Sequence, residues 1–195
     1  MDTSNPSPQE APHPSVSDIL IAATLDDVSE IRKLMQEASD FKMSRGDDLW
    51  GTEPFTDDEV ARLIIGGKMF VYKIDGTSAA SVLLANNDER MWGDAGDDDS
   101  AIYVHRLCVG DSFRGKGVGQ KVLNLAEDFA LQKNKVRLRL DCPYDNRSLC
   151  GYYEQLGFRE VRRYDRPNST GGRNPQKDVY RAALYQKELA GATPE

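Results

Sequence analysis

Hydrophobic and polar residues alternate along the chain with two different periods. Hydrophobic residues recur every three or four positions after Thr24 and after Thr56, and each Thr is followed three residues later by an acid, which is the pattern of a helix with a capping box. Other stretches alternate every second residue, and two of them meet at Asp75-Gly76, a hairpin signal. The pattern predicts helices after Thr24, at 56–65, from Gly115 to about Lys133 and from Asn146, and strands at 19–23, 69–74, 78–85, 101–109, 136–141, 158–164 and 179–187.

The order of these elements favours one fold class. Strands and helices mix without strict alternation, which favours a mixed α/β sheet with helices on both faces over a doubly wound parallel sheet. A chain of 195 residues has the size of one domain. We expect that domain at 18–187, with a disordered polar tail rich in proline at 1–17 and a short tail at 188–195.

Charge and composition argue against several classes of function. A net charge of −7 disfavours a general nucleic-acid partner and fits a cationic acceptor only weakly. The cysteines, Cys108, Cys142 and Cys150, form no C-x-x-C pair, and the histidines are His13 and His105, so we expect no metal site. The odd cysteine count and the lack of a leader pattern indicate a cytoplasmic protein. No apolar run approaches the roughly 20 residues that span a membrane, so no membrane partner is expected.

The segment from Tyr103 to Gly119 carries the strongest chemical signal. It has the pattern of a strand, a short loop and three glycines, at 115, 117 and 119, that open an amphipathic helix. Backbone N–H groups at a helix start have no partner within the helix, and the helix dipole is positive there. Glycines let an anionic ligand approach this backbone closely. We therefore predict a phosphate or pyrophosphate site, although a simple tight turn has the same glycine pattern.

Two nucleotide-binding loops match this segment only in part. Gly110 and Gly115-Lys116 fit the start of the P-loop, but Gly117 stands where the Ser or Thr that binds Mg²⁺ is required. The dinucleotide fingerprint G-x-G-x-x-G fails because the spacing here is G-x-G-x-G, although an acid, Asp141, does end the next strand. A nucleotide or dinucleotide binder remains the least favoured hypothesis.

A third interpretation includes a second motif downstream. Arg114 to Gly119 spells R-x-x-G-x-G before a helix, and the next strand is followed by Asn146 at a helix start, Tyr153 near the helix end and Gly157-Phe158. This order of strand, glycine loop, helix, strand, Asn helix, Tyr and Gly-Phe resembles the GNAT superfamily, the N-acyltransferases that use acyl-coenzyme A.

The resemblance is clear over about residues 101–163 and coarser over about 18–187, and it implies a mostly antiparallel sheet of six to seven strands that splays at its central strands. It implies acetyl-CoA as co-substrate, with its pyrophosphate on the glycine loop and its pantetheine arm paired with the backbone of the central strand. It also implies that Asn146 contacts the coenzyme arm, although Asn is equally common as a helix N-cap. The residues expected at the cofactor are Leu107, Cys108, Val109, Arg114, Gly115, Lys116, Gly117, Val118, Gly119, Asn146 and Tyr153.

Two side chains are candidates for catalysis. The family register implies that the Tyr153 phenol donates a hydrogen bond or proton to the leaving thiolate, and the other interpretation is an aromatic core residue. His105 is two residues before Leu107 and therefore expected on the same strand face. It is a candidate general base, since the ordinary pKa of histidine is about 6.5, although a strand histidine is more often structural. Acids of the loop at 40–55 are alternatives for binding the acceptor or relaying its proton, namely Asp47, Asp48 and Glu53, while Trp50 and Trp92 either line the cleft or pack.

Two functions of a GNAT-like fold compete, ahead of the less favoured nucleotide binder. The favoured one transfers the acetyl group of acetyl-CoA to a primary amine by direct attack in a ternary complex. A backbone N–H near Cys108 or Val109 would polarise the thioester carbonyl. All three cysteines are expected to be buried and inert. The alternative is a non-catalytic acyl-CoA-binding or regulatory module of the same fold. A small-molecule acceptor is favoured over a protein, the loops at 40–55, 86–100 and 165–178 should select it, and the resemblance allows a homodimer.

Overall fold

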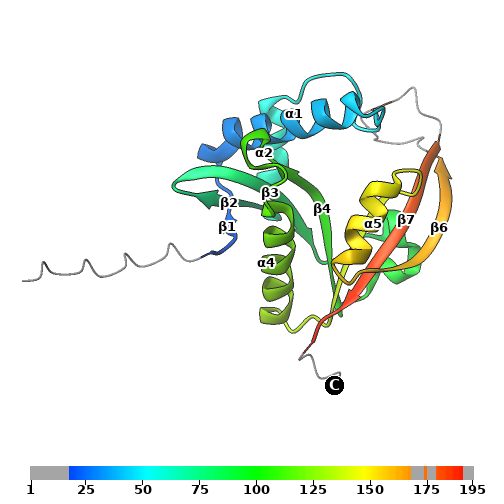
Figure 1. The fold of residues 1–195 in the computed structure, drawn as a ribbon. Coiled ribbons are helices and arrows are strands. Elements are labelled where there is room, and N and C mark those ends of the chain that lie inside the picture. The colour runs from blue at the N-terminus through cyan, green and yellow to red at the C-terminus, as the bar shows by residue number, and fades with distance from the viewer. Residues whose placement is uncertain (1–17, 168–173, 175–178, 191–195) are drawn as a thin grey trace, which may run out of the picture.

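A computed structural model describes residues 18–167, 174 and 179–190. Its strands form one sheet in the order β1-β2-β3-β4-β5-β7-β6, in which β4 and β5 are parallel and the other neighbouring pairs are antiparallel (Figure 1). This confirms the predicted mixed, mostly antiparallel sheet. The strands are β1 (Ile21–Ala22), β2 (Met69–Ile74), β3 (Thr77–Ala85), β4 (Ala101–Val109), β5 (Arg137–Pro143), β6 (Arg159–Pro167) and β7 (Val179–Glu188), and the helices are α1 (Val28–Ser44), α2 (Asp57–Ile65), α3 (Glu89–Trp92), α4 (Val118–Gln132) and α5 (Arg147–Gln155).

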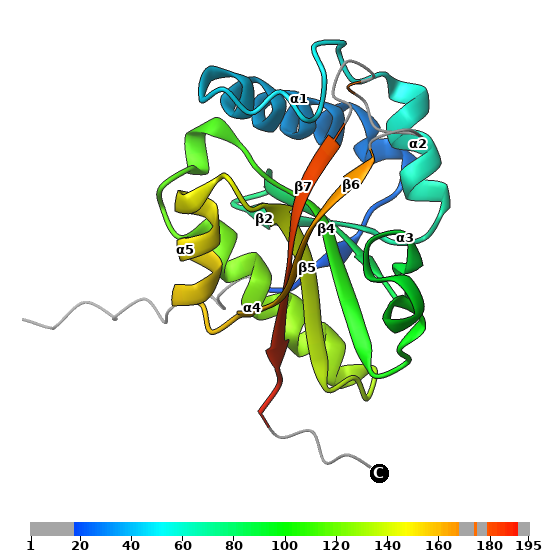
Figure 2. The same cartoon turned by 90° about the vertical axis from the view of Figure 1, so that its right-hand side faces the viewer.

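Helices cover both faces of the sheet, as predicted (Figures 1 and 2). α1 and α2 pack against β2 and the end of β4 through Ile31, Met35 and Val60, all fully buried. α4 and α5 cover the opposite face, where Val122 and Cys150 join the largest core cluster. The hydrophobic stripe on each long helix is therefore the side that packs on the sheet, which is why the helical period predicted these elements.

Local sequence signals set the ends of several elements. The capping box predicted at Thr56 forms, because the Thr56 hydroxyl accepts from the Glu59 N–H at 3.3 Å while the Glu59 carboxylate accepts from the Thr56 N–H at 2.8 Å. A second box forms at Thr24. Between β2 and β3, Asp75 and Gly76 have φ of 50° and 76°, the backbone of a tight hairpin turn.

Two boundaries differ from the sequence prediction. α4 begins at Val118 rather than at Gly115, because Gly115 and Gly117 have φ of 76° and 79°, a left-handed backbone that cannot continue into a helix. The acidic segment at 86–100, predicted as a loop, contains α3 and a 3₁₀ turn. It is ordered in this way because Met91 and Trp92 are buried against the sheet.

The chain remains packed to the end of β7. Leu189 follows that strand and is buried in the largest core cluster, so the packed structure extends past 187. The predicted tail at 1–17, most of the predicted loop at 165–178 and residues 191–195 lie outside the described residues. None of the described helices has both the length and the apolar character that crossing a bilayer requires.

The central strands β4 and β5 pair over only part of their length. They run in register from Ala101 opposite Arg137 to Val104 opposite Leu140, and they separate beyond that point. This confirms the expected splay. The edge of β4 that faces β5 is therefore unpaired from His105 to Val109 within the described part of the chain, and both strands contribute to a cavity there.

A bulge lies in β4 at the point of separation. His105 and Cys108 pair with β3 residues only two apart, so Arg106 and Leu107 lie opposite a single residue. Arg106 has φ of 49°, which is uncommon for a residue other than glycine. The extra residue changes the alternation of side chains, so that Leu107 packs toward the cluster under α4, whereas His105 lies on the other face beside Asp88, the residue that precedes α3. The expectation that His105 and Leu107 share a face is therefore wrong.

Candidate functional site

A cavity of about 910 Å³ occupies the region where β4 and β5 separate, a volume typical of sites for small molecules and cofactors. α1, β4, the glycine loop, α4, β5, α5 and β7 all contribute to its walls. All of the residues predicted for the cofactor or for catalysis line it except Cys108, which is buried elsewhere, and Lys116, which is exposed. Those that line it are His105, Leu107, Val109, Arg114, Gly115, Gly117, Val118, Gly119, Asn146 and Tyr153.

The glycine loop presents backbone N–H groups that the chain itself does not use. The first backbone hydrogen bond of α4 runs from the Lys121 N–H to the Gly117 carbonyl at 3.0 Å. The N–H groups of residues 115 and 117–120 have no hydrogen-bond partner among the residues that the structure describes. Because the helix dipole is positive at this end, these free donors form a site suited to an anion.

The glycines have different roles in this loop. A Cβ added at Gly115 or Gly117 would meet no atom within 4 Å, so the space beside these residues is open. A Cβ added at Gly119 would lie 3.0 Å from the Tyr152 hydroxyl and 3.8 Å from Cγ2 of Val109. Gly119 therefore allows the start of α4 to pack closely against the Tyr152 hydroxyl of α5.

Arg114 holds the loop in place. Its guanidinium pairs with the Asp111 carboxylate, donates to the carbonyls of Val109 at 3.2 Å and Glu37 at 3.4 Å, and lies 4.0 Å from the centre of the Phe41 ring. The Asp111 N–H donates to the Glu37 carboxylate at 2.8 Å. These contacts fix the glycine loop to α1, so backbone groups rather than the Arg114 charge dominate the anion site.

Asn146 is the N-cap of α5. Its Oδ1 accepts from the Leu149 N–H at 3.1 Å, which bears out the N-cap interpretation. The amide NH₂ group makes no hydrogen bond to another described residue, and Asn146 lines the cavity. The same side chain can therefore start the helix and donate to a ligand.

Two adjacent tyrosines of α5 line the cavity at different places. The Tyr152 hydroxyl lies beside Gly119 at the start of α4. Burial raises the pKa of Tyr153, and the neighbouring Cys142 and Asp141 raise it further, so the Tyr153 phenol keeps its proton at neutral pH. Its hydroxyl makes no hydrogen bond to another described residue. Tyr153 is therefore a free hydrogen-bond donor beside β5.

On the face of β4 that carries α3, His105 lies between two carboxylates. Its Nε2 is 3.6 Å from Oδ2 of Asp88, and its Nδ1 is 3.9 Å from Oδ1 of Asp141. The Tyr180 hydroxyl donates to the other oxygen of Asp141 at 2.5 Å. One oxygen of Asp88 caps α3 by accepting from the Met91 N–H at 3.2 Å, whereas Oδ2 is buried without a hydrogen-bond partner among the described residues.

Burial raises the pKa of Asp88. The His105 side chain opposes this effect and the Asp141 carboxylate adds to it. The cluster of Asp88, His105 and Asp141 therefore contains a carboxylate whose ionisation is unfavourable unless a cation approaches it.

Residue types and distances in this cluster also meet the first requirement of a divalent cation site, since one ligand atom from each side chain lies within 4.8 Å of the others. However, Asp88 and Asp141 face different nitrogens of His105, and a metal takes only one of them. The arrangement is that of an imidazole ring that lies between two carboxylates. The sequence did not predict Asp88 or Tyr180 at this site, and Asp141 was noted only as the acid that ends a strand.

In the predicted acceptor loop at 40–55, the Asp47 carboxylate makes its contacts with neighbouring residues of the chain. Asp47 pairs with Lys42 and accepts from the Leu49 N–H at 3.2 Å. Trp50 lines the cavity, whereas Trp92 packs in the core with its ring 6.0 Å from that of Tyr103. The cavity is not lined by the acids that were predicted as alternatives for binding the acceptor, which are Asp47, Asp48 and Glu53.

All three cysteines are free and buried, as predicted. Burial raises the pKa of the Cys108 thiol to about 12. Burial also raises the pKa of Cys142, whose sulfur lies 3.8 Å from that of Cys150. A thiol that is not ionised is a poor nucleophile, so these residues are unsuited to covalent catalysis.

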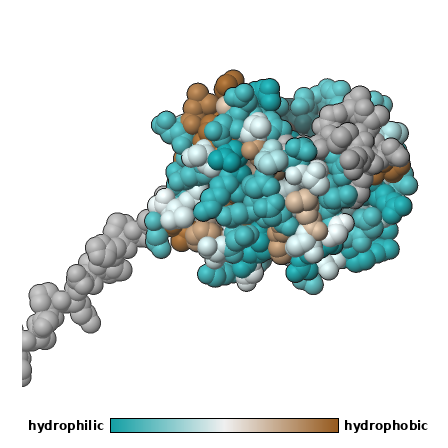
Figure 3. All heavy atoms as spheres, turned by 90° about the horizontal axis from the view of Figure 1, so that it is seen from above, coloured by the Kyte–Doolittle hydropathy of each residue, from teal (hydrophilic) through white to brown (hydrophobic). Residues whose placement is uncertain are grey.

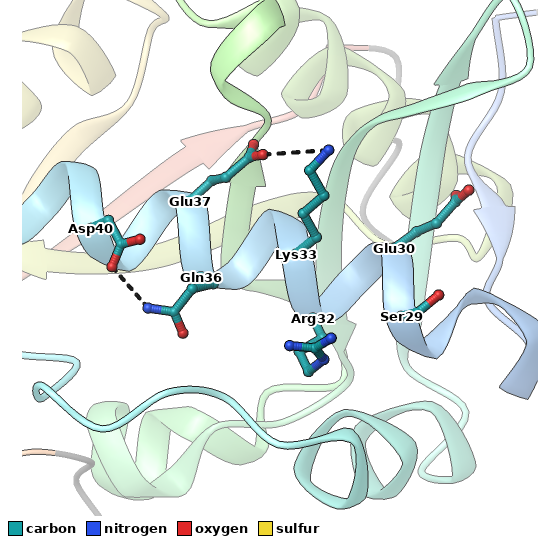
Figure 4. Close-up of a pocket in the computed structure, with 7 residues that line it drawn as sticks. All are labelled: Ser29, Glu30, Arg32, Lys33, Gln36, Glu37 and Asp40. Carbon is teal, nitrogen blue, oxygen red and sulfur yellow. Dashed lines mark hydrogen bonds and ion pairs between the residues drawn. The ribbon is translucent and has the colours of Figure 1, made fainter.

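A second hollow, of about 450 Å³, lies along the outer side of α1 (Figure 4). Its side chains bond to one another along the helix: Gln36 donates to Asp40 at 2.8 Å, and Lys33 lies 3.8 Å from Glu37. The surface seen from above is largely hydrophilic (Figure 3). Paired polar residues four positions apart are typical of the solvated side of an amphipathic helix, so we assign this hollow no chemistry.

Comparisons with known proteins point to one family. The protein-family model described as "Acetyltransferase (GNAT) family" matches residues 31–158. The protein named "Uncharacterized N-acetyltransferase YesJ" of Bacillus subtilis (strain 168) is 34% identical over 142 residues, which cover 70% of this chain and 78% of that protein.

Solved structures share the fold at lower sequence identity. A GNAT-family acetyltransferase from Listeria monocytogenes 4b F2365 aligns with a TM-score of 0.69 and 23% identity over 88% of this chain and 95% of that one. The putative acetyltransferase yncA from Salmonella typhimurium, solved with its cofactor acetyl-CoA, aligns with a TM-score of 0.63 and 16% identity over 92% and 98% of the two chains. The family match and the Bacillus relative show that this chain belongs to the acetyltransferase (GNAT) family and is an acyltransferase of the N-acetyltransferase type.

Proposed function

We propose that the protein transfers the acetyl group of acetyl-CoA to a primary amine by direct attack within a ternary complex. The observation that carries this proposal is the convergence of free backbone donors at the start of α4, the unpaired edge of β4 and the Tyr153 phenol on one cavity. The yncA structure with acetyl-CoA supports the choice of cofactor, because it shares this fold.

The glycine loop binds the coenzyme A pyrophosphate in this proposal. The free N–H groups of residues 115 and 117–120 donate to it, and the open space beside Gly115 and Gly117 admits it. The unpaired edge of β4 then hydrogen-bonds the pantetheine arm as a neighbouring strand would. The Asn146 amide donates to the same arm.

The direction of the β4 backbone favours one donor for the thioester carbonyl. The Gly110 N–H donates to the Ala79 carbonyl of β3 at 3.0 Å. Because N–H directions alternate along a strand, the Cys108 N–H also faces β3, whereas the Val109 N–H faces the unpaired edge. Of the two residues considered from sequence, Val109 is therefore the better oxyanion donor.

The transfer needs two proton movements. His105 takes a proton from the acceptor ammonium, and the neutral amine attacks the thioester carbon, forming the C–N bond. The C–S bond then breaks, and Tyr153 donates a hydrogen bond or proton to the departing thiolate. The nitrogen releases its second proton as the amide forms, and this proton neutralises the thiolate directly or replaces the one that Tyr153 has given. Burial raises the pKa of Tyr153, so the phenol still carries its proton when the thiolate forms. Holding both substrates together supplies much of the acceleration.

The direct test is a panel of primary amines incubated with acetyl-CoA. We expect coenzyme A release that depends on the amine, together with an acetylated product found by mass spectrometry. Binding of acetyl-CoA without transfer to any amine would contradict the proposal and favour the non-catalytic acyl-CoA-binding module.

A further inference from the structure

Asp88 carries an unused acceptor in the wall of the cavity. Its side chain is 8% exposed, and Oδ2 has no hydrogen-bond partner among the described residues. A buried carboxylate oxygen without a donor is costly, and such groups are retained where a ligand or proton completes them. Oδ2 itself is closed off from the cavity, so a bound molecule can supply the missing donor when the side chain of Asp88, which lines the cavity, turns toward it.

The surroundings of Asp88 define the charge of that molecule. Asp88 and Asp141 are 3.6 and 3.9 Å from opposite nitrogens of His105, so two carboxylates converge on one imidazole. Lys42 is paired with Asp47, and Arg114 is paired with Asp111, so these cations of the cavity wall are already committed. The acidic cluster therefore favours a positively charged group with several N–H donors.

We propose that Asp88, His105 and Asp141 bind the reacting ammonium group of the acceptor, and that the acceptor is a primary alkylammonium without a carboxylate on the carbon that bears the nitrogen. This inference rests on the proposed transferase function and names its substrate class. Asp88 contributes the unpaired oxygen and Asp141 contributes Oδ1. His105 lies between them and accepts the proton that the ammonium releases.

A carboxylate beside the amine would lie close to these two acids. Like charges in a partly buried site repel strongly, which disfavours an α-amino acid relative to the amine that lacks its carboxylate. Other charged or titratable groups that act on the cluster are Arg90, which attracts the Asp88 carboxylate, and Tyr180, which donates to Asp141. The apolar part of the wall includes Leu49, Trp50 and Met91, so the amine should carry an apolar body.

The test uses 2-phenylethylamine as the probe, added to the full chain saturated with coenzyme A, so that binding is measured without turnover. The chain has two histidines, His13 and His105, so their imidazole NMR signals can be assigned with a His13→Gln variant. We expect the amine to shift the His105 signals and leave those of His13 in place.

The decisive variant is Asp88→Asn, which keeps the side-chain shape and an oxygen that can cap α3. Its matched control is Glu89→Gln, the same change of charge at the adjacent exposed residue, which does not line the cavity. Removing one partner of a buried charge pair should weaken 2-phenylethylamine binding by about 30-fold or more in Asp88→Asn. We expect both variants to bind coenzyme A as the unchanged protein does. Asp141→Asn provides a second variant should Asp88→Asn fail to fold.

Phenylalanine, which adds a carboxylate to the same amine, should bind at least about tenfold more weakly than 2-phenylethylamine. Several outcomes would overturn the proposal: unchanged amine binding in Asp88→Asn, phenylalanine binding as tightly as the amine, or no amine binding by the complex with coenzyme A. Loss of amine binding on adding EDTA would also overturn it, in favour of a divalent cation. Binding that depends on Asp88 without acetyl transfer would support the ammonium site and contradict only the transferase function.

Discussion

Gly117 offers a sharp test of where the coenzyme binds. Its φ of 79° is left-handed, and a Cβ built on it meets no atom within 4 Å, so Gly117→Ala adds strain without a clash. Left-handed backbone costs an alanine about 1–2 kcal/mol. For a chain of this size, that lowers Tm by about 2–8 °C. The new methyl group would also occupy the open space beside the free N–H groups.

Gly67 provides the matched control. It follows α2, has φ of 69° with no atom within 4 Å of an added Cβ, and does not line the cavity. Gly67→Ala should therefore lower Tm by a similar amount. Acetyl-CoA at 100 times its Kd should stabilise the unchanged protein and Gly67→Ala by about 2.7 kcal/mol. If the Gly117 methyl weakens binding about tenfold, the same concentration stabilises Gly117→Ala by only about 1.4 kcal/mol. Equal stabilisation of the two variants would refute the assignment of the pyrophosphate to this loop.

Four further predictions follow from the site and its surroundings. Tyr153→Phe should lower turnover by about 100-fold with acetyl-CoA affinity unchanged, while Tyr152→Phe, the adjacent control, should have a much smaller effect in the same assay. Cys108 should react with a thiol reagent at pH 8 only after unfolding, because burial raises its pKa to about 12, and rapid labelling of the folded protein would contradict this. Burial raises the pKa of Asp88 in the folded state, so the contribution of this residue to stability falls as pH rises above the ordinary aspartate pKa. Asp88→Asn should therefore raise the free energy of unfolding at pH 7 by about 1 kcal/mol or more, as measured by unfolding in urea. Burial alone would raise the pKa of Asp98, but hydrogen bonds and nearby guanidinium groups outweigh burial and lower the pKa. The stabilisation by Asp98 should therefore be present at neutral pH and lost as pH falls below about 4. Asp98→Asn should flatten this dependence of stability on acid pH.

Sequence periodicity predicted most of the fold because the elements bury simple stripes. The capping boxes at Thr24 and Thr56 and the hairpin at Asp75-Gly76 are local signals, and all three form. The start of α4 was misplaced because the glycines that suit an anion site also adopt left-handed backbone, so the helix begins three residues later. Glycine pattern alone does not separate a loop from a helix start.

Within the candidate site, motif residues were easier to predict than contacts between distant segments. The resemblance to the GNAT superfamily implied that the glycine loop, Asn146 and Tyr153 meet at one site, and all of them line the cavity. The face of His105 was predicted wrongly, because one extra residue at Arg106 reverses the alternation on which that prediction relied. No periodic pattern indicates a bulge of this kind.

The partners of His105 were missed for a related reason. Asp88 lies in the acidic segment at 86–100, which was predicted as a loop. Burial of Met91 and Trp92 orders that segment and places Asp88 in the cavity wall. Tyr180 joins the cluster through β7, which lies beside β5 although some 40 residues separate the two in sequence. Such contacts depend on tertiary packing and carry no local signal.

Thermal melting with acetyl-CoA, coenzyme A, ATP and NADH, each tested separately, shows whether the cavity binds coenzyme A or a nucleotide. We expect stabilisation by acetyl-CoA or by both coenzyme A forms, of about 2.7 kcal/mol at 100 times Kd, which corresponds to roughly 5–10 °C for a chain of this length. Stabilisation by ATP or NADH alone would contradict the account and assign the free N–H groups at the start of α4 to a nucleotide.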